Sequence, residues 1–322
     1  MKILITGGGG FLGFRLAQAL LARGKLGGQA IAGITLLDGA FPPAAAQEPR
    51  FKAVVGDVSD AKTLAGVCPP DIDAVFHLAA VVSGAAETDF DLGMRVNLEG
   101  TKLLLAQLRK CARPPRVVYT SSVAAFGGTL PPVLDDATIA NPQTSYGTQK
   151  VIGEYLLSDY SRKGFIDGRA LRLPTIVVRA GKPNAAASSF ASGIIREPLN
   201  GAVSDCPVAP ETGVWLLSPK RVVEAFLHAW ELPPEAWGTQ RWLNLPGITA
   251  SVAQMVEALR KVAGAKVAGR VVYKADARIQ AIVKTWPVNF RTPRALEMGF
   301  KPDPDVETLI RDYIAHESIK PA

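Results

Sequence analysis

A run of glycines between a short apolar segment and a helical pattern constrains the fold of this chain more than any other feature. The sequence TGGGGFLG occupies residues 6–13, where the apolar run Lys2–Thr6 ends and the periodic segment Phe11–Arg23 begins. At such a junction, backbone N–H groups and the positive end of the helix dipole can hold a pyrophosphate. The glycines satisfy both GxGxxG and GxxGxxG, so their spacing leaves the type of dinucleotide site open. A flexible turn with incidental glycines is the alternative.

Short apolar runs alternate with amphipathic segments through the first half of the chain. Such runs lack polar alternation, which is typical of parallel strands that are covered on both faces. The predicted strands are Lys2–Thr6, Ile31–Leu37, Phe51–Val55, Ala74–Leu78, Arg116–Thr120 and Arg169–Leu173, and the predicted helices are Phe11–Arg23, Ala61–Val67, Phe90–Cys111 and Tyr146–Lys163. Together they predict an α/β fold with a doubly wound, Rossmann-type parallel sheet.

The carboxyl-terminal part has a different character. Residues 181–245 are rich in Ala, Ser, Pro and Gly, and their irregular pattern predicts loops and short elements that form a lid or substrate lobe. Beyond them, Ser251–Val262 reads as an amphipathic helix capped by Ser251. We expect residues 1–180 to form the dinucleotide-binding domain and residues 181–322 mainly a smaller substrate-binding lobe, with some segments returning to the first domain.

Composition excludes several classes of protein. With 48% hydrophobic and 20% charged residues, the chain has the composition of a globular enzyme. Its three cysteines form no CxxC pair and its three histidines are not spaced as metal ligands. We therefore expect neither a disulfide framework nor a metal site.

Charge and hydropathy bear on partners and location. The net charge of +7 comes from scattered Lys and Arg residues without a basic block, which argues against nucleic acid and suits a small anionic substrate. The apolar run at the amino terminus is too short for a signal peptide, and no stretch approaches the length of a membrane span. We expect a cytoplasmic protein without a membrane partner.

Two aspartates extend the predicted dinucleotide site beyond the glycine loop. Asp38 ends the second strand, where a carboxylate can accept hydrogen bonds from the adenosine ribose and repel a 2′-phosphate, which favours NAD over NADP. Its spacing from the loop is somewhat long, so an aspartate that only ends a strand is the alternative. Asp57 can accept from the adenine amino group or cap the helix that follows. The predicted cofactor contacts in this region are Gly7, Gly10, Phe11, Leu12, Gly13, Asp38, Asp57 and Val58.

Three polar residues are candidates for proton transfer. Tyr146 and Lys150 are four residues apart, so they share one face if the segment is helical. Ser122 follows a buried-type strand, and ligands of open parallel sheets bind at the carboxyl ends of the strands. An ammonium near a phenol stabilises the phenolate, so Lys150 can make Tyr146 a base near neutral pH. Ser122 can hold the reacting hydroxyl. The alternative is an exposed Tyr and Lys pair without a role.

These motifs together resemble the extended short-chain dehydrogenases, the NAD-dependent epimerase/dehydratase family. The resemblance covers residues 1–180 and rests on the combination of motifs. The matching residues are Thr6, Gly7, Gly10, Gly13, Leu78, Ala79, Ala80, Asn97, Ser121, Ser122, Tyr146 and Lys150. It implies a Rossmann domain with a small carboxyl-terminal substrate lobe and NAD as the cofactor.

The resemblance also implies roles for individual residues. The residues placed at the cofactor are Leu78, Ala79, Ala80, Asn97, Tyr146 and Lys150, the last two at the nicotinamide ribose, and we add Pro174. For Asn97, a helix-interior position with a local backbone bond is an equal alternative. Family members commonly dimerise through the helices that begin near Phe90 and Tyr146, so we expect a homodimer.

Departures from the family pattern narrow the reaction. Val123 and Ala124 follow Ser122 where nucleotide-sugar dehydratases of the family carry an acidic pair, which argues against dehydration. The segment Leu171–Arg179, followed by Lys182 and Asn184, resembles a subgroup that oxidises the 2-hydroxyl of a four-carbon sugar acid such as D-erythronate. A nucleotide-sugar epimerase needs the same Ser, Tyr and Lys groups and stays open as the alternative.

A sugar acid requires a partner for its carboxylate. A guanidinium is the natural bidentate partner, and Arg179 is our candidate. A surface salt bridge is an equal alternative for Arg179, and the competing residues are Arg172, Arg196 and Arg291. Ser83 and Thr175 are further candidates for contacts to sugar hydroxyls.

The sequence therefore predicts an enzyme that uses NAD to oxidise an aldonate at C2 to the 2-oxo acid. In this hypothesis Tyr146 is the general base, Lys150 assists it and Ser122 orients the hydroxyl, so these three are the catalytic residues. A third reading, a non-catalytic dinucleotide sensor that regulates a partner, is disfavoured because such a protein has no need of the proton-transfer residues.

Overall fold

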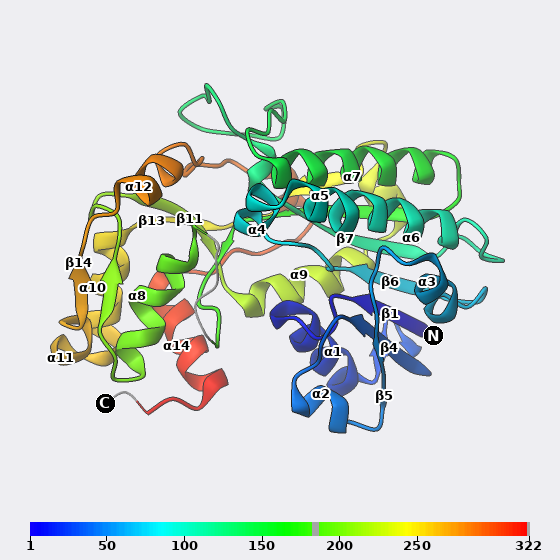
Figure 1. The fold of residues 1–322 in the computed structure, drawn as a ribbon, viewed down its shortest axis with the longest axis horizontal. Coiled ribbons are helices and arrows are strands. Elements are labelled where there is room, and N and C mark those ends of the chain that lie inside the picture. The colour runs from blue at the N-terminus through cyan, green and yellow to red at the C-terminus, as the bar shows by residue number, and fades with distance from the viewer. Residues whose placement is uncertain (182–186, 321–322) are drawn as a thin grey trace. The chain divides into compact units, whose positions relative to one another are not determined.

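A seven-stranded sheet organises the amino-terminal part of the computed structural model, which describes residues 1–181 and 187–320 (Figure 1). The strand order is β12-β8-β7-β6-β1-β4-β5. The strands are β1 (Lys2–Thr6), β4 (Gly33–Asp38), β5 (Phe51–Val55), β6 (Ala74–His77), β7 (Arg116–Ser122), β8 (Asp167–Leu173) and β12 (Trp242–Asn244). Strands β5, β4, β1, β6 and β7 pair in parallel. The predicted doubly wound α/β fold is confirmed.

Helices cover both faces of this sheet. The helices α3 (Ala61–Val67), α6 (Gly100–Leu108) and α7 (Ser145–Arg162) pack on one face, where their apolar side chains meet buried residues of β1, β6, β7 and β8. On the other face lie α1 (Phe11–Arg23) and α9 (Pro219–Glu231) (Figure 1). Burial on both faces explains why the strands read as continuous apolar runs.

The chain divides into two compact units. The first consists of Met1–Ala125, Thr144–Arg172 and Val223–Leu243, and the second of Phe126–Gln143, Leu173–Val222 and Asn244–Ala322. The sequence-based boundary at residue 180 falls within the segment Leu173–Val222. Part of α9 belongs to the first unit, so the chain returns there after residues of the second unit.

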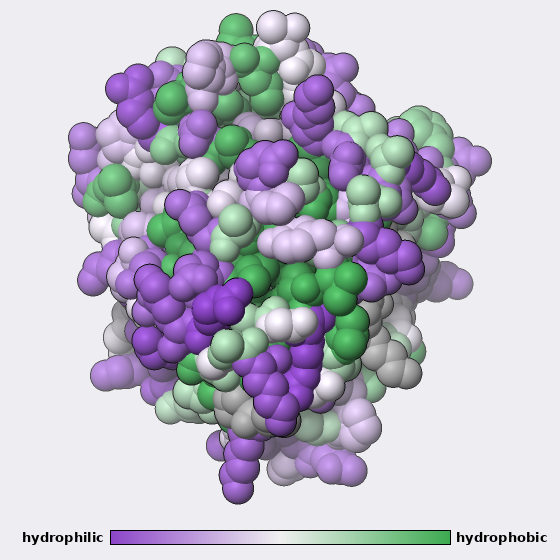
Figure 2. Space-filling model, turned by 90° about the vertical axis from the view of Figure 1, so that its left-hand side faces the viewer, coloured by the Kyte–Doolittle hydropathy of each residue, from purple (hydrophilic) through white to green (hydrophobic). Residues whose placement is uncertain are grey.

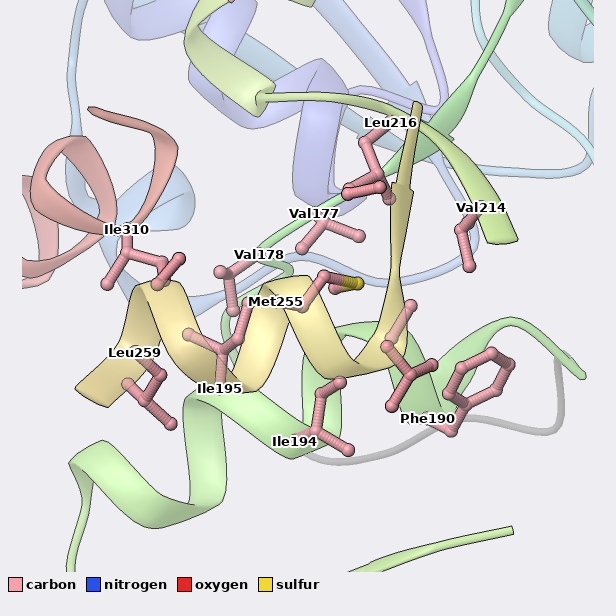
Figure 3. Packing of buried hydrophobic residues seen from close by; sticks show 14 of the residues in the cluster. Val177, Val178, Phe190, Ile194, Ile195, Val214, Leu216, Met255, Leu259 and Ile310 are labelled. Atoms are coloured by element: carbon pink, nitrogen blue, oxygen red, sulfur yellow. The ribbon is translucent and has the colours of Figure 1, made fainter. Parts of the chain in front are cut away.

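The second unit has its own small sheets and core. The strands β9 (Thr175–Ile176), β11 (Gly213–Leu217) and β13 (Ile248–Ser251) form one sheet, and β10 (Ser204–Cys206) pairs with β14 (Val271–Tyr273). The helices α8 (Ser189–Leu199), α10 (Val252–Ala263) and α14 (Val306–Glu317) pack around the core. Figure 3 shows Met255 and Leu259 of α10 packed with Ile194 and Ile195 of α8 and Ile310 of α14.

The remaining elements are short. They are β2 (Lys25–Leu26), β3 (Gln29–Ala30), α2 (Pro43–Gln47), α4 (Ser83–Thr88), α5 (Phe90–Gly93), η1 (Met94–Glu99), η2 (Val123–Ala125), η3 (Pro234–Trp237), α11 (Ala265–Ala268), α12 (Ala277–Val283) and α13 (Pro293–Glu297). The helix predicted over Phe90–Cys111 is thus divided into α5, the π-helical segment η1 and α6. No helix in the described part of the chain is long and apolar enough to cross a membrane.

The prediction of loops and short elements for residues 181–245 is wrong in part. This stretch contains α8, with 11 residues, and α9, with 13. In α8 the small residues that suggested a loop, among them Ala191, Ser192 and Gly193, are buried on a tightly packed helix. Small side chains allow close helix packing, so composition alone did not separate this helix from a loop.

Both polar and apolar side chains are exposed on the surface. Figure 2 shows one side, where purple residues predominate and green residues gather near the centre. In the second unit the exposed apolar side chains include Val203, Val272 and Tyr273, next to or within β10 and β14. Isolated exposed apolar residues of this kind are common on protein surfaces.

The predicted cap at Ser251 is confirmed and generates a stability prediction. The Ser251 hydroxyl accepts from the Gln254 amide, and the Gln254 side chain accepts from the Ser251 amide, which forms a capping box. We expect Ser251→Ala to lower the free energy of unfolding by about 1 kcal/mol in urea titrations, and Ser251→Asp, which keeps an acceptor, to lower it less. An unchanged unfolding midpoint for the alanine variant would contradict this expectation.

Candidate active site

The glycine loop packs so closely that several of its glycines, Gly7 and Gly13 among them, admit no side chain. Gly7 has a φ of +72°, and a Cβ there would lie 2.7 Å from the amide nitrogen of Ala79. A Cβ on Gly13 would lie 2.8 Å from the carbonyl carbon of Gly7. These contacts hold the first turn of α1, which carries Phe11 and Leu12, against the loop and against the residues that follow β6.

The start of α1 has the properties of an anion site. Gly10 is the N-cap and, within the described residues, no side chain caps this helix and no acidic residue occupies its first turn. The amide groups of the first turn therefore need acceptors from outside the helix. These features are compatible with a dinucleotide pyrophosphate at this loop.

Asp38 lies beside the loop in spite of its long spacing in the sequence. It is the last residue of β4, which pairs with β1, and its Oδ2 accepts from the Gly9 amide at 3.0 Å. The sheet register thus brings the carboxylate and the glycines together. Leu78, Ala79 and Ala80 come after β6 at the same edge, with the Leu78 amide 3.0 Å from the Thr6 carbonyl oxygen.

Asp57 does not cap the following helix, so that alternative is wrong. Asp60 is the N-cap of α3 and accepts from the amides of Lys62 and Thr63. Asp57 instead accepts from the Ser59 amide and hydroxyl and pairs with Arg95. Burial opposes ionisation of Asp57, but these hydrogen bonds and the guanidinium outweigh it and lower its pKa.

Asn97 joins two parts of the candidate site. It lies in η1, where Oδ1 accepts from the Val81 amide at 2.7 Å and Nδ2 donates to the Val81 carbonyl oxygen at 3.0 Å. The alternative of a local backbone bond is therefore wrong. Nδ2 also donates to Gln149 Oε1 at 2.7 Å. Asn97 thus ties the loop after β6 to helix α7.

Gln149 and Arg95 were not predicted from the sequence. Gln149 is buried next to Lys150, and its side chain reaches Asn97 from α7. Arg95 lies two residues before Asn97 and reaches Asp57. Neither residue belongs to a known motif. Positions 149, 153 and 157 have the spacing of one buried face of α7, and this helical periodicity could have marked Gln149 as a buried amide next to the candidate lysine.

Ser122 and Tyr146 are both half-buried within the first unit. Ser122 ends β7, where its Oγ accepts from the Ala124 amide at 3.1 Å. Tyr146 lies in the first turn of α7, which is capped by the Thr144 hydroxyl on the Gly147 amide. Helix α7 packs against both β7 and η2, so the elements that carry these side chains are neighbours.

Lys150 is buried and faces Tyr146. Its side chain is 2% exposed, and its Nζ lies 5.6 Å from the centroid of the Tyr146 ring. Burial lowers the pKa of Lys150 to about 7, and the Glu154 carboxylate opposes this shift. The predicted helical face shared by Tyr146 and Lys150 is thus observed, and the lysine is poised to change its charge near neutral pH.

Two of the arginines that compete with Arg179 are engaged elsewhere. Arg172 donates through Nε and Nη2 to the buried carboxylate of Glu154, at 2.8 and 2.6 Å. Arg196 pairs with Glu197 and donates to the carbonyl oxygen of Arg179. Both side chains are buried, so neither is placed to bind a ligand carboxylate without losing an internal partner.

The remaining candidates divide between the two units. Val58 is buried beside Gly100, and Ser83 begins α4, both within the first unit. Pro174, Thr175 and Arg179 belong to the second unit, where the Arg179 amide donates to Ser192 Oγ at 3.0 Å. Lys182 and Asn184 lie outside the described residues.

Comparison with known proteins identifies the family. The model of the NAD dependent epimerase/dehydratase family matches residues 3–221, more than half of the chain. The chain belongs to this family. It is an NAD-dependent oxidoreductase, as the sequence predicts.

Similar proteins within and near the family carry two kinds of name. The D-erythronate dehydrogenase of Cupriavidus necator is 56% identical over 318 residues and 98% of both chains, and that of Haemophilus influenzae is 42% identical over 98% of this chain and 100% of its own. A crystal structure described as the nucleoside-diphosphate-sugar epimerase from Agrobacterium tumefaciens has a TM-score of 0.93 and 43% identity, covering 99% of this chain and 94% of its own.

The close packing at Gly13 predicts how the loop responds to a methyl group. We expect Gly13→Ala to abolish detectable NAD binding in calorimetric titrations, because its Cβ would displace Gly7 and open the loop. Gly33→Ala is the matched control, since a Cβ at Gly33 has nothing within 4 Å. Equal NAD affinity of the two folded variants would refute the assignment of this loop.

Proposed function

We propose that this enzyme oxidises the C2 hydroxyl of D-erythronate, or of a closely related aldonate, to the 2-oxo acid with NAD. The two relatives named D-erythronate dehydrogenase support the substrate, because they match nearly the whole chain. The observation that carries the chemistry is the buried Lys150 ammonium beside the half-buried Tyr146. That arrangement favours a phenolate and therefore a general base.

In the proposed mechanism each catalytic side chain has one task. Ser122 Oγ holds the substrate hydroxyl, and Tyr146 Oη removes its proton as the carbon is oxidised. Lys150 Nζ stabilises the phenolate before the proton arrives. Bound NAD supplies the hydride acceptor for this oxidation.

The cofactor contacts proposed from the sequence are kept. The proposed contacts are Gly7, Gly10, Phe11, Leu12, Gly13, Asp38, Asp57, Val58, Leu78, Ala79, Ala80, Asn97, Tyr146, Lys150 and Pro174. The Asp38 carboxylate, which accepts from the Gly9 amide, would also accept hydrogen bonds from the adenosine ribose hydroxyls. Its negative charge would disfavour a 2′-phosphate.

We assign the substrate carboxylate to Arg179. The engagement of Arg172 with Glu154 and of Arg196 with Glu197 supports this choice, since a buried guanidinium is costly to remove from its carboxylate. Ser83 and Thr175 remain our candidates for hydrogen bonds to sugar hydroxyls.

A nucleotide-sugar epimerase is the second candidate. The description of the similar Agrobacterium structure favours it, and the same Ser, Tyr and Lys groups can serve that reaction. An epimerase regenerates its NAD, whereas a dehydrogenase accumulates NADH. Net reduction of NAD therefore separates the two functions.

We also propose that the enzyme is a cytoplasmic homodimer that associates through α5 and α7. These helices contact each other and carry exposed apolar side chains, of which Phe90 is 58% and Tyr155 59% exposed. Ile152 lies on the same helix as Tyr155 and is also exposed. The three cysteines are unpaired, which suits a reducing compartment.

Turnover with NAD and D-erythronate tests the proposed reaction. We expect the absorbance of NADH to rise with the wild-type enzyme and Tyr146→Phe to lower kcat by about 100-fold or more, because the base is lost. Tyr160→Phe is the control, since Tyr160 lies on the same helix and packs against Phe165. Turnover of a nucleotide sugar without formation of NADH would reject the proposed substrate. An unchanged kcat for Tyr146→Phe would reject the proposed mechanism.

Sedimentation velocity tests the proposed interface. We expect the wild-type enzyme to sediment as a dimer and Tyr155→Glu to sediment as a monomer, because a charge buried in an apolar interface lacks a partner. Val55→Glu serves as the control, because Val55 is 71% exposed on β5, outside the proposed interface. A monomeric wild-type enzyme, or a dimer in both variants, would contradict the interface.

A further inference from the structure

Lys150 faces a second aromatic ring that the proposed mechanism leaves without a role. Its Nζ lies 4.8 Å from the centroid of the Tyr119 ring, closer than the 5.6 Å to the Tyr146 ring. Tyr119 is on β7 and is 1% exposed. The face of an aromatic ring is electron-rich and attracts a cation most strongly where water is excluded.

The Tyr119 ring is fixed on one side by His77. The two ring centroids are 5.5 Å apart, and the His77 nitrogens bond Thr6 Oγ1 at 2.6 Å and Thr101 Oγ1 at 2.9 Å. Burial lowers the pKa of His77 to about 3, so its ring stays neutral. Thr101 donates to the Asn97 carbonyl oxygen, so it accepts from His77 Nε2, and Nδ1 accepts from Thr6.

Gly153, on helix α7, leaves room for the Tyr119 ring. A Cβ on Gly153 would lie 2.8 Å from Tyr119 Cζ, so any side chain there would displace the ring. Glycine is unfavourable inside a helix, yet it occupies this buried position in α7, one turn after Lys150. The helix backbone therefore packs directly on the ring that faces the ammonium.

Tyr119 supplies an electron-rich face without a charge of its own. Burial raises the pKa of its phenol well above 10, so the ring stays neutral over the working range of pH. The other groups that face Lys150 are Tyr146 and Glu154 on α7 and His77 on β6. Glu154 is shared with Arg172, so its charge supports Lys150 only in part, and the Tyr119 ring is a direct contact of the ammonium.

We propose that Tyr119 is a positioning residue whose ring face holds the Lys150 ammonium beside Tyr146. Tyr119 acts through Lys150, and its effect on turnover rests on the proposed function. The effect of Tyr119 on the Lys150 ammonium does not rest on the proposed function. The effect on turnover and the effect on the ammonium can therefore be tested separately.

The first experiment follows the ionisation of Lys150 in the NAD-free protein. Lysine labelled with ¹³C at Cε is titrated by NMR, and the Lys150 signal is assigned by its loss in Lys150→Arg. We expect Tyr119→Leu to lower the pKa of Lys150 by about half a unit to one and a half units, because the cation loses the ring face. Tyr119→Phe keeps a ring and should leave it unchanged.

Matched variants separate the ring from general packing. Tyr160→Leu makes the same change on α7, away from Lys150, and should not move the Lys150 signal. If Tyr119→Leu fails to fold, phenylalanine and trifluorophenylalanine at position 119 are compared, since fluorine weakens the ring face at nearly constant shape. The proposal is overturned if removing or fluorinating the ring lowers the Lys150 pKa no more than Tyr160→Leu does.

The second experiment measures kcat against pH with NAD and D-erythronate. We expect Tyr119→Leu to move the acid limb of the profile to higher pH, because a less protonated Lys150 stabilises the Tyr146 phenolate less. Tyr119→Phe, which keeps the ring, should show the same pH profile as the wild-type enzyme. A purely structural role of Tyr119 would not produce this difference between the two variants. No turnover by the wild-type enzyme would refute the proposed function and leave the NMR test to decide on Tyr119. If Tyr119→Leu shifts the Lys150 pKa but leaves the pH profile of kcat unchanged, the claim that Tyr119 acts on Tyr146 through Lys150 is overturned.

Discussion

The burial of one ammonium group imposes more on this structure than any other interaction. A lysine charge removed from water is unfavourable unless neighbouring groups replace its hydration. Lys150 is 2% exposed, and the groups around it are two aromatic rings and, one turn further along α7, a carboxylate. This environment keeps the charge finely balanced, which is the property that a lysine beside a catalytic phenol requires.

A chain of polar contacts connects the end of β1, next to the glycine loop, to the helix that carries Lys150. Thr6 ends the first strand, and its hydroxyl joins the Ala79 amide to His77. His77 bonds Thr101, and Thr101 donates to the Asn97 carbonyl oxygen. Asn97 then reaches Gln149, the neighbour of Lys150. The parallel register of β1 and β6 sets this chain in place, so the sheet that carries the glycine loop also helps to orient helix α7.

The sequence was most informative where a local signal ends an element. Strand Lys2–Thr6 and helix Phe11–Arg23 were predicted with their observed bounds, because the glycine loop separates them. The cap at Ser251 was predicted because a serine directly precedes an amphipathic run. Asp38 was expected beside the glycine loop although many residues separate the two in the sequence. The expectation holds because β4 pairs with β1 in parallel, so the carboxyl ends of the two strands meet whatever the number of residues between them.

Features that depend on tertiary packing escaped the sequence analysis. The π-helical segment η1 lies inside what reads as one continuous helix, and nothing in its apolar pattern marks the change. The buried helix α8 has the small residues of a loop. Gln149 and Tyr119 read as ordinary helix and strand residues, because their importance comes from side chains that are far apart in the sequence.

The central claim is that the Lys150 ammonium makes Tyr146 ionise more readily. Ultraviolet difference titration of the NAD-free enzyme, with Tyr146→Phe used to isolate the signal of this tyrosine, measures that ionisation directly. We expect Tyr146 to form its phenolate at lower pH in the wild-type protein than in Lys150→Met, because only the wild-type protein has a cation at the ring. The same titration midpoint for Tyr146 in both proteins would contradict it.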